Sequence, residues 1–116
     1  MKVVNRIKAN EDFVTTVRKG RTLKDSSYIV HYLTNNELKI CRIGISVSKK
    51  IGNAVTRNRV KRQIRAMCDS LVNYSLHTLD LVIIVRSDYL SKDFNDNKES
   101  LKKIFVEIGI TDEKEN

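Results

Sequence analysis

The sequence predicts an α+β fold in which helices pack on a single β-sheet. Apolar residues recur at helical spacing in three segments, and they alternate or run continuously over strand lengths in others. The predicted order is helix, strands, helix, strand, helix, which is typical of one sheet with packed helices. With 116 residues, 41% of them apolar, the chain fits a single domain spanning residues 1–116 with a modest core.

Residues 10–20 are predicted to form the first helix. Asn10 is a suitable N-cap, acidic residues follow in the first turn, basic residues occupy the last turn, and Gly20 ends the segment. Phe13 and Val17 are four residues apart and therefore share a face. If this helix packs beside an open sheet face, the two side chains would line a groove for single-stranded nucleic acid.

Two strands are predicted next, at residues 28–33 and 38–47. Turn-like residues 34–37 separate them, which favours a hairpin. The second strand alternates apolar residues with small ones, so one of its faces is apolar and the other is small and polar. The small face, which leaves room for close approach to the backbone, carries Gly44, Ser46 and Ser48.

A long basic helix is predicted at residues 54–73, with Asn53 as its N-cap. Its core-facing stripe consists of Val60, Ile64, Met67 and Leu71, spaced four, three and four apart. The polar residues are predicted to fan out over the face away from this stripe, with Arg59 on the far flank: Arg57, Asn58, Lys61, Arg62 and Arg65.

The C-terminal half contributes one strand and one helix. Residues 80–86 contain a continuous apolar run between Asp80 and Arg86, which predicts a central strand buried on both faces, or nearly so. Leu101, Ile104, Phe105 and Ile108 mark a last amphipathic helix, and residues 111–116 are predicted to be a frayed polar tail.

Positive charge is concentrated in the first part of the chain. Residues 1–65 hold 16 basic and four acidic side chains, whereas residues 66–116 hold six basic and ten acidic ones. Between Leu38 and Cys68 there are nine Lys or Arg and no carboxylate to form ion pairs along the helix. The alternative is a solvated basic face that only aids solubility. Three observations favour binding to nucleic-acid phosphates instead. The segment has no carboxylates, most of its cations are arginines, and Lys49 and Lys50 lie beside a helix N-terminus.

Several other functions have little support. A helix-turn-helix needs a helix, not a strand, before the basic helix, and the P-loop pattern lacks its second glycine. A metal-dependent nuclease needs clustered carboxylates, and His31 and His77 show no paired partner for two-histidine catalysis. No segment is apolar enough for a membrane span, and no secretory signal pattern is present. The two cysteines lack metal-site or disulfide-framework spacing, which favours reduced thiols in the cytoplasm.

The run from Ser46 to Arg65, SVSKKIGNAVTRNRVKRQIR, closely resembles the "RNR" signature of the bacterial ribonuclease P protein component. The resemblance extends to residues 10–13 and to the strand before Arg86, and so covers most of the chain. The overall sequence is similar to low-GC Gram-positive members, of a staphylococcal type. For the fold, this resemblance implies an α/β sandwich with a four-stranded sheet, similar to ribosomal protein S5 domain 2. It also implies a left-handed βαβ crossover, against the strong right-handed default.

The resemblance also implies a partner and a reaction. The chain would join a catalytic RNA that hydrolyses precursor tRNA to remove the 5′ leader. Mg²⁺ would be held by the RNA, none of this chain's side chains would be catalytic, and no membrane or obligate protein partner is expected. RNA contacts are implied for Lys49, Lys50, Asn53, Arg57, Asn58, Arg59, Lys61, Arg62 and Arg65. A cleft for the single-stranded leader is implied at Phe13, Val17, His31, Ser46 and Arg86. Relatives can carry Phe and Tyr where this chain has Val17 and His31, so the aromatic lining is reduced.

Two alternatives remain open at this point. One is a non-enzymatic RNA-binding protein of ribosomal type that uses the same basic helix structurally. The other is a stand-alone nuclease. Cleavage assays with and without the catalytic RNA would separate all three interpretations.

Overall fold

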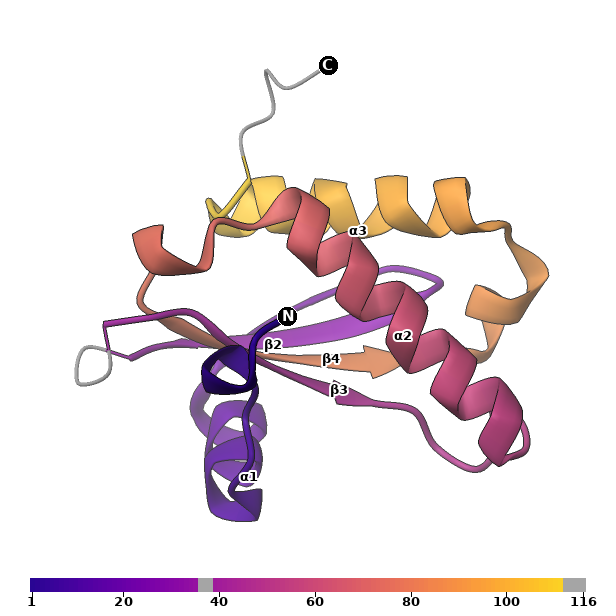
Figure 1. Ribbon diagram of the computed structural model, residues 1–116, viewed down its shortest axis with the longest axis horizontal. Coiled ribbons are helices and arrows are strands. Elements are labelled where there is room, and N and C mark those ends of the chain that lie inside the picture. The colour runs from indigo at the N-terminus through magenta and orange to yellow at the C-terminus, as the bar shows by residue number, and fades with distance from the viewer. Residues whose placement is uncertain (36–38, 112–116) are drawn as a thin grey trace.

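The computed structural model describes residues 1–35 and 39–111 (Figure 1). Four strands form one sheet: β1 (Arg21–Lys24), β2 (Tyr28–Thr34), β3 (Arg42–Ser46) and β4 (Leu79–Val85). Three α-helices pack on it: α1 (Asn10–Lys19), α2 (Ala54–Leu71) and α3 (Phe94–Ile108). Short 3₁₀ turns lie at η1 (Val3–Asn5), η2 (Tyr74–Leu76) and η3 (Ser87–Ser91). The predicted α+β class and the four-stranded sheet are confirmed.

The strand order is β1-β2-β4-β3, with β4 antiparallel to β2 and parallel to β3. The predicted hairpin between residues 28–33 and 38–47 is therefore wrong, because β4 lies between those two strands. The physical reason is burial. Leu81, Val82 and Ile83 have no exposed surface, so both faces of β4 need covering and the strand takes an inner position.

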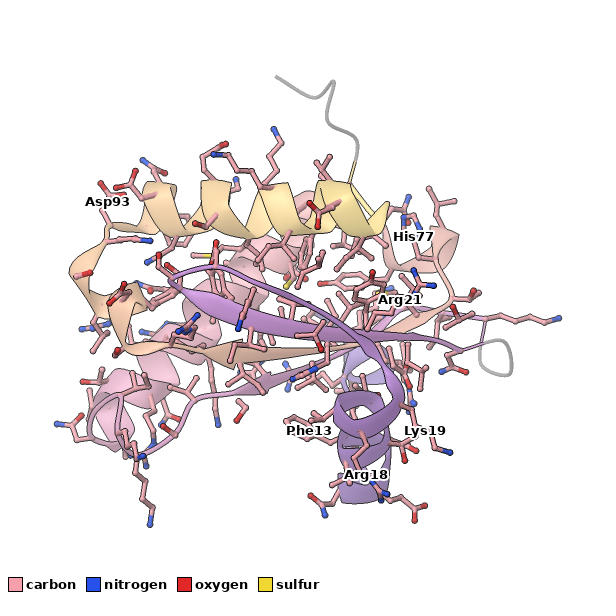
Figure 2. All side chains as sticks on the ribbon, turned by 180° about the vertical axis from the view of Figure 1, so that it is seen from behind. Phe13, Arg18, Lys19, Arg21, His77 and Asp93 are labelled. Carbon is pink, nitrogen blue, oxygen red and sulfur yellow. The ribbon has the colours of Figure 1, made fainter. Side chains whose placement is uncertain are left out.

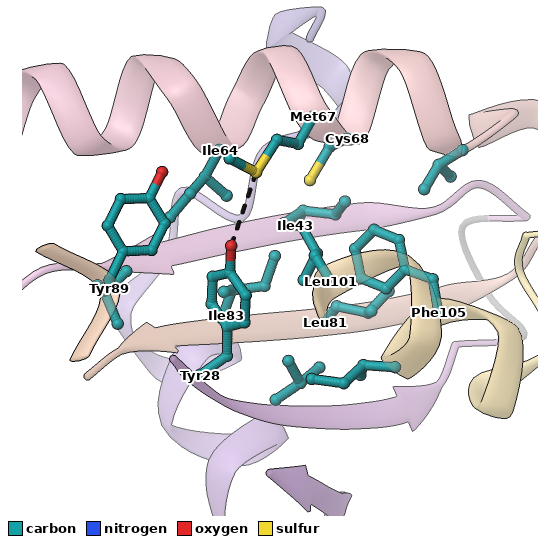
Figure 3. Packing of buried hydrophobic residues seen from close by; sticks show 14 of the residues in the cluster. Tyr28, Ile43, Ile64, Met67, Cys68, Leu81, Ile83, Tyr89, Leu101 and Phe105 are labelled. Carbon is teal, nitrogen blue, oxygen red and sulfur yellow. Dashed lines mark hydrogen bonds between the residues drawn. The ribbon is translucent and has the colours of Figure 1, made fainter. Parts of the chain in front are cut away.

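One face of the sheet is covered by α2 and α3, and the main core lies between them (Figure 3). Ile43, Leu81 and Ile83 from the sheet meet Ile64 and Met67 of α2 and Leu101 and Phe105 of α3. Tyr28 is fully buried in this layer, and its hydroxyl donates to the backbone oxygen of Asn97 at 2.9 Å. Burial raises the pKa of the Tyr28 hydroxyl, which stays protonated.

The opposite face of the sheet carries α1, as Figure 1 shows, and the Ile7 side chain packs beside it over Gly44. We call it the α1 face; Gly44, Ser46, Val82 and His31 point toward it. Gly20 joins α1 to β1, and the backbone around it leaves no room for a side chain. A Cβ on Gly20 would lie 2.5 Å from the backbone oxygen of Thr16 and 2.6 Å from that of Tyr32. This close approach is why glycine is needed at the junction, since its φ of −73° is open to any residue.

β3, α2 and β4 form a βαβ unit with two parallel, neighbouring strands. In Figure 1 both strands point the same way, and α2 passes in front of and above them on the side away from α1. When the sheet is viewed from the α2 side with the strands pointing up, β4 lies to the left of β3. The crossover is left-handed, against the usual preference. The likeness to ribosomal protein S5 domain 2 stays a prediction.

Some element ends differ from the sequence-based expectations. The N-cap of α1 is Ala9, not Asn10, because Asn10 is already helical and no side chain caps this end. β1 was not predicted at all, and α2 ends at Leu71, two residues early. Thr111 is held by a hydrogen bond from its hydroxyl to the Leu71 oxygen at 2.8 Å, so the predicted fraying does not begin there. Residues 112–116 lie outside the described part of the chain.

Candidate nucleic-acid interface

The loop between β3 and α2 positions the first group of predicted RNA-binding residues. Ile51 is buried, and its amide donates to the Ser48 oxygen at 3.0 Å, which folds the loop into a turn. Lys49 and Lys50, immediately before this anchor, are exposed. Asn53 then caps α2 as predicted, because its side-chain oxygen accepts from the Thr56 amide at 2.9 Å. Two lysines therefore lie close to a capped helix N-terminus, where anions are favoured.

Within α2, the core stripe and the basic surface are separate, as the spacing predicts. Val60, Ile64 and Met67 are fully buried, and Cys68 joins them. Leu71 is half-buried at the end of the stripe. Asn58, Arg59 and Arg62 are exposed on the outer side of the helix. The predicted core stripe and the predicted exposure of Asn58 and Arg62 are therefore confirmed.

Arg57 does not belong to the outer fan, and the structure corrects that prediction. It is half-buried, and its Nη1 donates to the Gly52 oxygen at 2.8 Å. Arg57 precedes Val60 by three residues, so at 3.6 residues per turn it projects beside the core stripe. Lys61 and Arg65 continue the same flank and are half-buried too. This flank is opposite Gln63, which accepts a hydrogen bond from Tyr89 of η3.

The cations of α2 have no carboxylate partners within residues 1–35 and 39–111. The ion pairs of that part of the chain involve Arg42 and the N-terminal amine, not the arginines or lysines of α2. The only acidic residue in α2, Asp69, lies near its C-terminal end. The resulting field over α2 is positive and is not neutralised locally, so it favours a polyanion.

The α1 face brings together four of the five residues predicted for the leader site. Phe13 and Val17 lie on α1, and the Phe13 ring covers Gly44: a Cβ there would be 3.1 Å from the ring's Cδ2. Ser46 is two residues further along β3 on the same face. His31 reaches this face from β2, through the register His31–Val82–Gly44. The space above Gly44 of β3 is therefore occupied by the Phe13 ring of the protein.

Arg86 lies just beyond the end of β4, two residues after Ile84, which pairs with Ser46. It is exposed, and its Nη1 donates to the Asp25 oxygen in the β1–β2 turn at 2.7 Å.

His31 is held in a neutral state by its surroundings. Its Nδ1 lies 2.9 Å from the Thr22 hydroxyl oxygen. Burial lowers the pKa of the imidazole below its usual value, because the charged form loses water contacts. At neutral pH, His31 therefore contributes a flat, uncharged ring to the α1 face.

An ion triad with a buried Arg42–Asp80 pair, which the sequence interpretation missed, links α1 to the sheet. Arg42 of β3 binds Asp80 of β4 with two hydrogen bonds, at 2.7 and 2.9 Å, and Asp12 of α1 at 3.3 Å. The Arg42 and Asp80 side chains are only 15% and 10% exposed. The hydrogen bonds to Asp80 raise the pKa of the guanidinium further. The sequence did offer one sign of this ion pair, because Arg42 and Asp80 are opposite charges at the starts of two apolar strands.

The described residues hold neither a metal-ligand cluster nor a membrane-spanning helix. No three His, Cys, Asp or Glu side chains among them gather in a way that could hold a metal ion. No helix in that part of the chain has the length and apolar character needed to cross a membrane.

Comparisons with known proteins show the family to which this chain belongs. The family model described as ribonuclease P matches residues 1–109. A ribonuclease P protein component of Bacillus cereus is 40% identical over 110 residues, covering 95% of this chain and 96% of the relative.

Two solved structures are similar as well. The RNase P protein of Staphylococcus aureus matches with a TM-score of 0.82 and 32% identity, over 93% of this chain and 98% of the other. That of Thermotoga maritima matches with a TM-score of 0.73 and 25% identity, over 85% and 93%. The resemblance seen in the sequence is confirmed, and the chain belongs to the ribonuclease P family.

Proposed function

We propose that this chain is the protein subunit of ribonuclease P, the endoribonuclease that removes the 5′ leader of precursor tRNA. The observation that carries the proposal is the surface of α2. It presents Arg59 and Arg62 outward and Arg57, Lys61 and Arg65 on one flank, without a carboxylate partner among the described residues. Such a surface fits an RNA backbone, since arginine grips phosphate with two parallel hydrogen bonds.

The two surfaces of the protein would have different tasks. α2 and the loop carrying Lys49 and Lys50 would bind the catalytic RNA through its phosphates. The α1 face would hold the leader, because a single strand exposes its bases for stacking. The Phe13 ring, which lies over Gly44 of β3, would offer one stacking surface, and neutral His31 would add a second. With Val17 in place of a further ring, we expect weaker leader stacking than a fully aromatic face would give.

The chemistry would come from Mg²⁺ held by the RNA, which activates water for phosphodiester hydrolysis. In this proposal, the side chains of this chain would bind and orient RNA, and they would take no part in the bond cleavage. The partners in this proposal are the catalytic RNA and precursor tRNA, and the place of action is the cytoplasm, where tRNA is processed.

The proposal is tested by reconstitution. Precursor tRNA is incubated at low Mg²⁺ with a bacterial catalytic RNA, with the protein, and with both. We expect efficient cleavage only with both, at the mature 5′ end. Cleavage by the protein alone would indicate a stand-alone nuclease. Tight RNA binding without any lowering of the Mg²⁺ requirement would indicate a structural RNA-binding protein instead.

A further inference from the structure

A cavity of about 370 Å³ lies where the end of α1 meets β1, on the far side of α1 from Phe13. Lys19 and Arg21 form its cationic rim, and Tyr32 of β2 forms an aromatic wall. Leu33, Leu79 and Ile108 contribute apolar surface from β2, β4 and the last turn of α3. Neither α2 nor the residues of the predicted leader site take part in it.

The fold holds the two cations in place through Gly20, which lies between them. Its amide donates to the Thr16 oxygen at 2.9 Å, and its Cα passes so close to the Tyr32 backbone that no side chain fits. Arg21 is paired with Tyr32 across the β1–β2 ladder. In Figure 2, Lys19 lies on the side of α1 away from Phe13, and Arg21 lies above it at the sheet.

The charge at this junction is positive. Arg18, Lys19 and Arg21 are all exposed, and no carboxylate is among the residues that line the cavity. Within the described part of the chain, none of the three forms an ion pair. Arg18 and Lys19 also complement the C-terminal end of the helix dipole, which is a purely structural role. That role does not account for Arg21, which lies outside the helix and lines the cavity.

We propose that this cavity binds one nucleotide of single-stranded RNA. The base would stack on Tyr32 and lie against the apolar residues, while Lys19 and Arg21 would bind its flanking phosphates. A ring beside cations is the combination that holds single-stranded nucleic acid without reading its sequence. The volume is near the lower end of the 300–1,000 Å³ of ligand sites, roughly the size for one base and too small for a duplex.

The first experiment uses the isolated full-length protein and a defined probe, 5′-phosphorylated triuridylate. Amide chemical shifts are followed by NMR as the probe is added. We expect saturable shifts at Lys19, Arg21 and Tyr32, in addition to those on α2. In Arg21→Glu, an exposed position that leaves the core intact, the shifts at Tyr32 should disappear. The matched control, Lys103→Glu on the exposed side of α3, should keep them.

Affinity measurements add a quantitative test. Tyr32→Leu should weaken this site about tenfold, at the lower end of the range for one stacked base. For a longer single strand, Lys19→Ala and Arg21→Ala should each reduce the slope of log K against log salt by about 0.7. Shifts confined to α2 and the α1 face, or variants with unchanged salt slopes, would overturn the proposal.

The source of the nucleotide is identified with the holoenzyme, and this step rests on the proposed function. Arg21→Glu is compared with Lys103→Glu on three ligands: the catalytic RNA alone, precursor tRNA with a two-nucleotide leader, and precursor tRNA with a ten-nucleotide leader. A loss confined to the long leader identifies the leader, and a loss with catalytic RNA alone identifies that RNA. No loss with any of them would overturn the proposal in the holoenzyme, whereas failure of cleavage by the unaltered protein would overturn the proposed function instead.

Discussion

Replacing Arg42 with methionine is the sharpest test of how α1 is held on the sheet. The change removes the guanidinium that binds Asp80 at 2.7 and 2.9 Å and Asp12 at 3.3 Å. It leaves the Asp80 side chain, which is 10% exposed, with an uncompensated negative charge. Among the described residues, the Asn35 side-chain amide would then be the remaining side-chain donor to Asp80, with its Nδ2 3.1 Å from Asp80 Oδ1.

The expected cost follows from burial. Removing one partner of a buried ion pair costs about 3–5 kcal/mol, and the residual exposure of this pair favours the lower end, about 3 kcal/mol. Asp12 is different, because its side chain is 41% exposed and its contact is longer. Asp12→Asn should cost under about 1 kcal/mol. The double variant Arg42→Met with Asp80→Leu should recover much of the loss, since no buried charge is left alone.

The assay is urea unfolding, with the midpoint and the m-value measured for each variant. For an m-value of about 1.5–2 kcal/mol per molar urea, a loss of 3 kcal/mol moves the midpoint by about 1.5–2 M. Leader-dependent binding should fall in Arg42→Met as well, because Asp12 adjoins Phe13 and α1 would no longer be fastened. A loss below 1 kcal/mol in Arg42→Met, or an equal loss in Asp12→Asn, would refute this reasoning.

Four further predictions concern other parts of the molecule. Gly20→Ala should destabilise the fold by about 2 kcal/mol or more in urea unfolding, because its Cβ would lie within 2.6 Å of two backbone oxygens. Because burial lowers the pKa of His31, its contribution to stability is complete above the unfolded-state pKa of about 6.5 and declines as pH falls toward the lower folded-state value. His31→Gln should flatten that pH dependence. Arg62→Ala should weaken RNA binding alone, as shown by a smaller salt slope, whereas Arg57→Ala should also cost about 1 kcal/mol of stability through its lost hydrogen bond to a backbone oxygen. Phe13→Ala should selectively weaken binding of precursors with long leaders.

Each of these predictions can fail in a specific way. An unchanged urea midpoint in Gly20→Ala would mean that the α1–β1 junction can move to make room for the Cβ without loss of unfolding free energy. A pH dependence that persists in His31→Gln would assign it to another group. Equal stability losses in Arg57→Ala and Arg62→Ala would contradict their different environments. Equal losses with mature tRNA and long-leader precursor in Phe13→Ala would indicate a folding role.

The features that the sequence predicts well are those carried by neighbouring residues. In α2, the spacing of Val60, Ile64 and Met67 identifies the buried side, and Asn53 identifies the start. In β4, an unbroken apolar run correctly predicts burial on both faces. The predicted position of Arg57 is wrong, because its side chain lies beside the core stripe and donates a hydrogen bond to the Gly52 oxygen in the preceding loop.

Features that depend on distant residues were missed or wrong. β1 has four residues, three of them exposed, so no apolar pattern indicates a strand. The hairpin prediction assumed that strands adjacent in sequence pair in space, but the apolar β4 takes the place between them. Arg42 and Asp80 are 38 residues apart, and a charge at the start of each strand does not by itself indicate that the two residues meet.

By itself, the sequence determined the fold class, the capped basic helix and its separation from carboxylates, and the family, because each is encoded in contiguous residues. Only the tertiary structure decided the strand order, the placement of Phe13 over Gly44, the ion triad that holds α1, and the cavity at Lys19, Arg21 and Tyr32. Those features arise where segments far apart in the chain compete to bury apolar surface and to pair charge, and such competition is settled only by packing the whole chain.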